Sequence, residues 1–199
     1  MPYKPEHKQA TRKRIIESAR VLFNRRGVSD VSIDQIMSEA GLTRGGFYHH
    51  FKNKEELFAE AVTNFLHGQG AEMRSNAGVN TAQPGLEVIQ RMINGYLSTE
   101  HLGDLDGQCP LIALPSDISR AGDTVKESYQ QLLEAMIGLF ESNLVESNLE
   151  KSTAHRKKAL TLATMCVGGM VLARTLPDQH LADELRNAAR DSALAMLNL

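Results

Sequence analysis

Apolar residues recur at helical spacing through the first quarter of the chain. Over Lys8–Arg26 they return every three or four positions, which predicts one amphipathic helix, and Gly27 follows as a typical helix terminator. Ser32 and Gln35 have the spacing of a capping box, which predicts a short second helix ending at Gly41.

Two further helix starts follow closely. Thr43 can cap a third helix that runs to about His50, and Asn53 can cap a fourth. Glu55 and Glu56 in the first turn of that fourth helix favour it, because acidic side chains stabilise the positive end of a helix dipole. The second and third helices are thus joined by a short turn containing glycine, which is typical of a helix-turn-helix, although many helical proteins contain such a turn.

The rest of the chain also has helical periodicity. Longer helices are predicted around the segments 86–97, 125–144, 153–176 and 179–199. The segment 70–84, rich in Asn, Ala and Gly, is predicted to be a linker, and 101–108 a loop. Because no alternating pattern of useful length is present, we expect an all-α protein without strands.

Composition supports a globular chain and excludes several classes. The chain has 199 residues, of which 42% are hydrophobic and 23% charged, so it can bury a sizeable core. The longest uncharged run, Ala159–Ala173, falls short of the roughly 20 residues that a membrane span needs. The polar N-terminal residues have no apolar region typical of a signal peptide. Two cysteines cannot support a disulfide-rich scaffold, and we expect a cytoplasmic protein.

The charged residues are unevenly distributed along the chain, which the net charge does not reveal. The sum of −2 argues against a nucleic-acid partner. Residues 1–66, however, contain eleven basic and eight acidic residues, whereas residues 67–199 contain eleven and sixteen. A basic first third on an acidic remainder fits a protein whose N-terminal part meets a polyanion, and equally a strongly solvated first helix.

No metal or catalytic signature is evident. The common zinc-binding spacings are absent, as is the paired Glu-x-x-His arrangement of di-iron bundles. No nucleophile motif is recognisable. We therefore expect no metal, no cofactor and no enzymatic activity, with a helical-bundle enzyme as the less favoured alternative.

The segment 32–57, which contains AGLTRGGFYHHFKNKEEL, resembles the signature of TetR-family regulators, and the resemblance extends over about residues 10–66. It implies a helix-turn-helix DNA-binding domain over 1–52, a linking helix over about 53–68, and an effector-binding and dimerisation domain over 69–199. It further implies a homodimer formed through the last two helices. The implied function is repression from a palindromic operator, relieved by a small-molecule or redox effector. The alternative is a DNA-binding protein of the same fold with a non-transcriptional partner role.

The resemblance also implies which residues meet DNA. Thr43 begins the recognition helix, where hydroxyl and N–H groups can face a phosphate, and Arg44 can reach a phosphate or a guanine. Phe47 and Phe51 match buried positions of the family. Many family members carry Thr, Ser or Ala at Gly46, so base recognition here would depend more on other side chains. The expected DNA-binding residues are Ser32, Thr43, Arg44, Gly45, Gly46, Tyr48, His49, His50 and Lys54. The alternative for Tyr48 is a packed aromatic, and for the two histidines a cap and a surface residue.

The middle helices would then enclose an effector pocket. Its candidate lining is Met92, Tyr96, Cys109, Ile112, Tyr129, Met136, Phe140, Met165 and Cys166, all of which could equally be ordinary core residues. Cys109 follows a polar loop and precedes a proline, so exposure and a reactive thiol are conceivable. Gly168 and Gly169 in mid-helix indicate close helix packing at a dimer interface, or instead a kink or a contact within one subunit.

Overall fold

The computed structural model describes residues 5–79, 84–144 and 153–198. Every regular element in this part of the chain is a helix, which confirms the all-α fold class. The chain divides into two compact units, one formed by the residues up to His67 together with Leu105–Gln130, the other by Gly68–Asp104 together with Gln131–Leu199. The expected boundaries at 52 and 69 divide the chain by function, and they stay a prediction.

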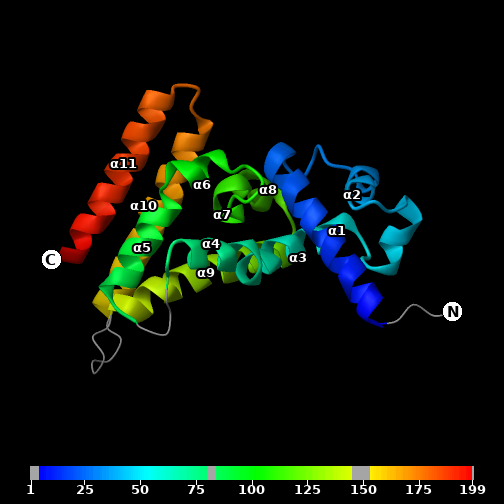
Figure 1. Ribbon diagram of the computed structural model, residues 1–199, viewed down its shortest axis with the longest axis horizontal. Coiled ribbons are helices and arrows are strands. Elements are labelled where there is room, and N and C mark those ends of the chain that lie inside the picture. The colour runs from blue at the N-terminus through cyan, green and yellow to red at the C-terminus, as the bar shows by residue number, and fades with distance from the viewer. Residues whose placement is uncertain (1–4, 80–83, 145–152, 199) are drawn as a thin grey trace. The chain divides into compact units, whose positions relative to one another are not determined.

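The first unit contains the predicted DNA-binding helices (Figure 1). Its elements are α1 (Pro5–Arg26), α2 (Ile33–Glu39), the 3₁₀ helix η1 (Arg44–His49), α3 (Lys54–His67), α7 (Pro110–Ala113), α8 (Pro115–Arg120) and the start of α9 (Asp123–Leu144). Helix α1 packs against both α2 and α3, and α2 packs against η1. The side chains of Ile15, Phe23, Ile36, Phe47 and Leu57 are fully buried in the core that these helices share.

Local signals in the sequence fix the turn between α2 and η1. The capping box is confirmed, because the Gln35 backbone N–H donates to Ser32 Oγ at 3.2 Å and the Ser32 N–H donates to Gln35 Oε1 at 2.8 Å. Helix α2 ends in a Schellman motif, in which the Leu42 N–H donates to the Met37 carbonyl at 2.8 Å. Gly41 has a φ of +65°, a conformation that glycine adopts without steric cost.

Three local predictions were wrong. The third helix is present as a short 3₁₀ helix over 44–49, but the Thr43 side chain makes no capping hydrogen bond to it. The predicted linker 70–84 contains α4 (Gln69–Asn76), and the first residues of the predicted loop 101–108 belong to α6 (Thr99–Gly103). Because most side chains of α4 are polar or small, this helix has no apolar stripe that could distinguish it from a linker in the sequence.

The second unit is built around two long helices (Figure 1). It contains α4, α5 (Leu86–Tyr96), α6 (Thr99–Gly103), the remainder of α9, α10 (Thr153–Thr175), α11 (Gln179–Ala195) and η2 (Met196–Asn198). Helices α10 and α11 pack along each other, and α5 packs against α11. Asp178 caps α11 as predicted, accepting a hydrogen bond from the His180 N–H at 2.9 Å. In the described part of the chain, no helix has the length and apolar character needed to cross a membrane.

One glycine of the pair in α10 serves a contact within the subunit. A Cβ placed on Gly169 would lie 2.7 Å from the Ala189 Cβ on α11 and 3.3 Å from Leu97, so Gly169 allows α10 and α11 to approach closely. A Cβ on Gly168 would meet nothing within 4 Å in the described structure. For Gly169 the intrasubunit alternative is therefore the correct one.

Candidate nucleic-acid interface

The short helix η1 presents one aromatic side chain to solvent and buries another. Tyr48 is 59% exposed, whereas Phe47 is completely buried. The two rings meet edge to face, with centroids 5.2 Å apart and an interplanar angle of 86°. Phe51 is also buried, at 5.6 Å from Phe47, so both phenylalanines lie where the family resemblance implies. Tyr48 is not the packed aromatic of the alternative interpretation, and its ring is available to a partner.

The two glycines of η1 have no structural need to be glycine. Neither Gly45 nor Gly46 has a positive φ. A Cβ on Gly45 would meet nothing within 4 Å, and one on Gly46 would reach only the terminal methyl of Met37 at 3.5 Å, an ordinary contact. Neither backbone conformation nor packing within the described structure therefore explains why these two residues are glycine.

Arg44 makes an ion pair that the sequence did not indicate. Its Nη1 donates to Asp34 Oδ2 at 2.8 Å, and this bond joins η1 to the first turn of α2. The two side chains remain 63% and 56% exposed. The surface around η1 therefore includes the Arg44 guanidinium, bonded to Asp34, and the exposed residues Thr43 and His49.

His50 lies at the end of η1 in a half-buried position. Burial and the positive charges of Lys8, Arg12 and His49 lower the pKa of its imidazole below the ordinary value. Its Nδ1 is buried and has no hydrogen-bond partner among the described residues. These surroundings disfavour the charged imidazole, whereas a negative group near the ring would favour it.

Lys54 has a structural role in addition to the predicted contact with DNA. Its ammonium group donates to the Val28 carbonyl at 2.8 Å and to the Val31 carbonyl at 2.9 Å, so it fixes the segment that leads into α2. Ser32, at the end of this segment, accepts the capping hydrogen bond from Gln35. Both residues therefore help to position the turn, whatever they contact outside the protein.

The segment 105–130 supports the DNA-binding helices through contacts that sequence reasoning missed. Arg25 binds both carboxylate oxygens of Asp106, with the second bond at 2.6 Å. The Asn24 side chain donates to the Gln108 carbonyl at 2.8 Å. These pairs are separated by more than 80 positions in the chain, so no local pattern could reveal them.

Two further bonds attach the same segment. The Val28 N–H donates to Asp117 Oδ1 at 3.0 Å, and the Gly122 N–H donates to Glu55 Oε1 at 3.0 Å. Together with the contacts of Asp106 and Gln108, they hold the C-terminal end of α1 and the start of α3 in place.

The predicted effector-pocket residues lie in both units. Six of them belong to the second unit: Met92, Tyr96, Met136, Phe140, Met165 and Cys166. Cys109, Ile112 and Tyr129 belong to the first unit, where the Tyr129 hydroxyl donates to the Leu111 carbonyl at 3.3 Å. Burial raises the pKa of Tyr129 to about 12, so this hydroxyl remains protonated.

The two cysteines are buried. Cys109 is only 3% exposed, so the expectation of an exposed thiol was wrong. It precedes Pro110 at the start of α7, and Leu111 and Ile112 beside it are buried as well. Burial raises the pKa of Cys166 to about 12, which keeps this thiol protonated and unreactive.

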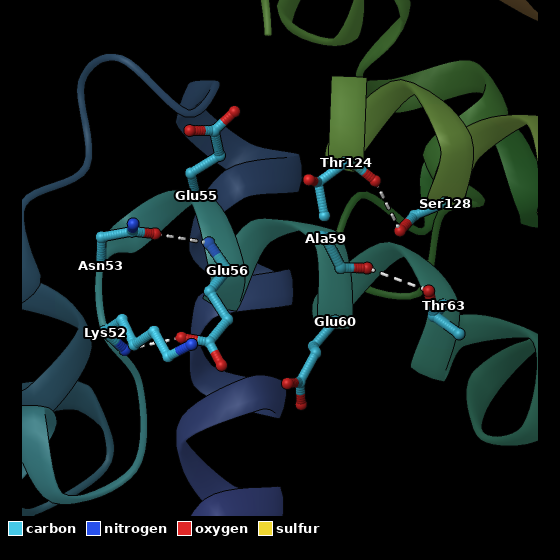
Figure 2. A pocket seen from close by; sticks show the side chains of 9 residues that line it. All are labelled: Lys52, Asn53, Glu55, Glu56, Ala59, Glu60, Thr63, Thr124 and Ser128. Atoms are coloured by element: carbon cyan, nitrogen blue, oxygen red, sulfur yellow. Dashed lines mark hydrogen bonds between the residues drawn. The ribbon is translucent and has the colours of Figure 1, made fainter. Parts of the chain in front are cut away.

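A hollow of about 430 Å³ lies on the first unit, beside α3 and the start of α9 (Figure 2). Its lining residues are Lys52, Asn53, Glu55, Glu56, Ala59, Glu60, Thr63, Thr124 and Ser128, none of which was predicted to line the effector pocket. Its carboxylates already have partners, because Glu56 accepts from the Lys52 N–H at 2.6 Å and Glu60 pairs with Arg12. Among the described residues, no group of side chains suited to a metal ion is present.

Sequence comparison identifies related transcriptional regulators. Residues 15–61 match the family model described as "Bacterial regulatory proteins, tetR family". The chain is 44% identical over 87 residues to the transposon Tn10 TetC protein of Escherichia coli, a match that spans 44% of each chain. It is 25% identical over 197 residues to an uncharacterised HTH-type transcriptional regulator of Mycobacterium tuberculosis, which covers 95% of this chain and 97% of that protein.

Solved structures share the fold over almost the whole chain. The reduced form of Escherichia coli NemR superimposes with a TM-score of 0.74 at 16% identity, covering 92% of this chain and 95% of that one. A TetR transcriptional regulator from Legionella pneumophila gives a TM-score of 0.72 at 19% identity, with 96% and 99% covered. The arrangement of an N-terminal helix-turn-helix and a C-terminal helical domain is therefore common to these structures and this chain.

Proposed function

The chain belongs to the TetR family of transcriptional regulators, and we propose that it is a repressor that binds a palindromic operator as a homodimer. One observation carries this proposal above the others: η1 combines an exposed Tyr48 with two glycines that the protein's own structure does not require. That surface lies on the helix-turn-helix matched by the family model.

In the proposed complex, η1 lies in the major groove and reads base edges. Thr43, Arg44, Tyr48 and His49 are the side chains in position to reach bases or phosphates, while Gly45 and its neighbour Gly46 allow the backbone to come close. Ser32, His50 and Lys54 flank η1 and would contact phosphates on either side. The two recognition helices of a dimer would occupy successive major grooves, about 34–36 Å apart.

The proposed dimer forms through α10 and α11. Both helices expose large apolar side chains in the single chain, with Leu160 42%, Leu172 54% and Leu181 42% exposed. Exposed apolar side chains on two helices that pack along each other favour association. The open space beside Gly168 on α10 would let a partner helix approach closely.

The proposed effector binds in the second unit, among the buried Tyr96, Phe140 and Cys166 and their neighbours. An effector that prefers a dimer with the wrong spacing of recognition helices would shift the population away from the DNA-bound form. A redox effector acting on Cys109 is the weaker version of this proposal, because the thiol is buried. It predicts that oxidants release DNA from the wild type and not from Cys109→Ser.

Selection of duplexes from a random DNA pool tests the proposal. We expect the folded, dimeric protein to enrich a palindrome, and its affinity to fall steeply as salt increases, because bound Lys and Arg release counterions from DNA. Failure to enrich any palindrome would refute the proposal. The selected site, placed over a promoter in a reporter, should lower transcription. Unchanged transcription would favour the alternative role, a DNA-binding protein without transcriptional control.

A further inference from the structure

Asp34 and Arg44 connect the two helices of the helix-turn-helix on its exposed side. The single bond between them, from Arg44 Nη1 to Asp34 Oδ2 at 2.8 Å, leaves the other N–H donors of the guanidinium available. Asp34 belongs to α2, which the Gln35–Ser32 capping box and the burial of Ile36 hold in place. The carboxylate is therefore a fixed support for a side chain that projects from η1.

The pair has little value for stability. Both side chains are more than half exposed, and ion pairs between exposed side chains contribute little to the folded state because water screens them. An acidic side chain beside a DNA-binding helix also opposes the approach of phosphates. Asp34 also lies in the first turn of α2, where a carboxylate is favoured by the helix dipole. The dipole accounts for the acidic residue, whereas the bond to Arg44 points to a second role in recognition.

We propose that Asp34 is a positioning residue that fixes the Arg44 guanidinium for reading a guanine in the operator. This inference depends on the proposed function, because it assumes that η1 enters the major groove. A free arginine loses side-chain freedom when it binds, whereas an arginine already held by Asp34 loses less. The remaining N–H groups match the O6 and N7 acceptors of guanine.

The same arrangement makes Asp34 a residue that increases specificity at the expense of general affinity. Its negative charge weakens binding to every duplex, while its bond to Arg44 strengthens binding only where a guanine lies opposite the guanidinium. On non-specific DNA only the unfavourable effect of the charge acts, whereas on the operator the favourable effect of the bond to Arg44 is added. Comparing the two kinds of DNA therefore separates the effects.

The test compares dissociation constants on the operator that the wild type selects and on duplexes in which each guanine pair is replaced symmetrically. For the wild type, replacing the guanine read by Arg44 should weaken binding about tenfold or more. For Asp34→Asn, that ratio should fall by a factor of about two to five at this position only, as expected for the loss of an exposed ion pair, while binding to a random duplex is unchanged or tighter. Arg44→Ala should lose the same ratio.

A matched control removes the same charge from the same helix. Glu39 is exposed on α2 and makes no bond to Arg44, so Glu39→Gln should change general affinity and leave the base ratio as in the wild type. Asp34→Asn should unfold at a denaturant concentration only slightly below that of the wild type, because it removes one acidic side chain from the first turn of α2.

The outcomes distinguish this inference from the proposed function. A wild type that selects no site contradicts the proposed function itself. A wild type that selects a site, together with an Asp34→Asn variant that retains the full guanine ratio, overturns the positioning role. Tighter operator binding by Asp34→Asn with an unchanged ratio would also overturn it, since Asp34 would then only compete with DNA for Arg44.

Discussion

Phe47 and Tyr48 are consecutive residues in opposite environments, with Phe47 fully buried and Tyr48 59% exposed, and their rings meet edge to face at 5.2 Å. The buried ring anchors η1 to the core of the first unit. The exposed ring is thereby held at a defined place on the surface. Phe47 thus serves the folding of η1, whereas Tyr48 serves its proposed recognition role. Substitutions at these two residues can test the two roles independently.

Replacing Tyr48 by Ala should weaken recognition and preserve the fold. Because the side chain is exposed, we expect the free energy of unfolding to change by no more than about 0.5 kcal/mol. Operator affinity should fall by about 1–3 kcal/mol in binding free energy, as for other base-contacting side chains. Fluorescence anisotropy and urea unfolding measure the two quantities. Phe47→Ala is the contrasting variant and should lose about 3–5 kcal/mol of stability. A large loss of stability in Tyr48→Ala would instead make its ring part of the core.

Gly45→Ala should weaken operator binding without lowering the stability of the protein. The added methyl group meets nothing within 4 Å in the free protein, and the backbone conformation suits alanine. Stability should therefore stay the same or rise by about 0.4–1 kcal/mol, through reduced entropy of the unfolded chain. Operator affinity should fall, since the methyl group would occupy the space that DNA needs.

The control for this variant is Gly41→Ala. Gly41 has a φ of +65°, so alanine there should destabilise the protein. If Gly45→Ala binds the operator as tightly as the wild type, close approach of the backbone to DNA is not the reason for the glycine.

Operator binding should become tighter as the pH falls from 8 to 6. Burial and the charges of Lys8, Arg12 and His49 lower the pKa of His50 in the free protein. A nearby phosphate would raise this pKa again, so binding takes up a proton, and affinity increases wherever the bound form holds more protons than the free form. The effect is at most about tenfold per pH unit for one proton.

His50→Gln should remove the part of the pH dependence that comes from His50. His49→Gln is the control, because it shows how much of the pH dependence comes from the exposed neighbouring histidine. Binding measured across this pH range at constant salt provides the check. Equal slopes for the wild type and His50→Gln would show that His50 does not sense the phosphate.

Leu172→Glu should convert the dimer to monomers. Leu172 on α10 is 54% exposed in the single chain, and a carboxylate there would be buried without a partner if α10 and α11 form the interface. Analytical ultracentrifugation should show a folded monomer. Leu105 in the first unit is 47% exposed, and Leu105→Glu should remain dimeric. A dimeric Leu172→Glu variant would place the interface elsewhere.

The sequence predicted those features that depend on near neighbours. The capping box of Ser32 and Gln35 and the end of α2 at Gly41 require only a few consecutive residues. Helix α4 was not predicted, because its polar side chains produce no apolar stripe.

Contacts between residues far apart in the sequence could not be predicted. The partner of Gly169 is Ala189 on the next helix, and the partners of Lys54 are carbonyls at Val28 and Val31. The burial of Cys109 likewise follows from how the segment 105–130 packs into the first unit. Such pairings depend on packing, which no short pattern encodes.

A hydroxyl-radical footprint of the wild-type dimer on its selected duplex tests the central claim most directly. The account predicts two symmetric protected half-sites about 34–36 Å apart, in successive major grooves. At a protein concentration just above the wild-type dissociation constant, the protection should be strongly reduced for Tyr48→Ala, although this variant is folded and dimeric. Protection that is absent, confined to one half-site, or unchanged in Tyr48→Ala would contradict a dimeric regulator that reads DNA through η1.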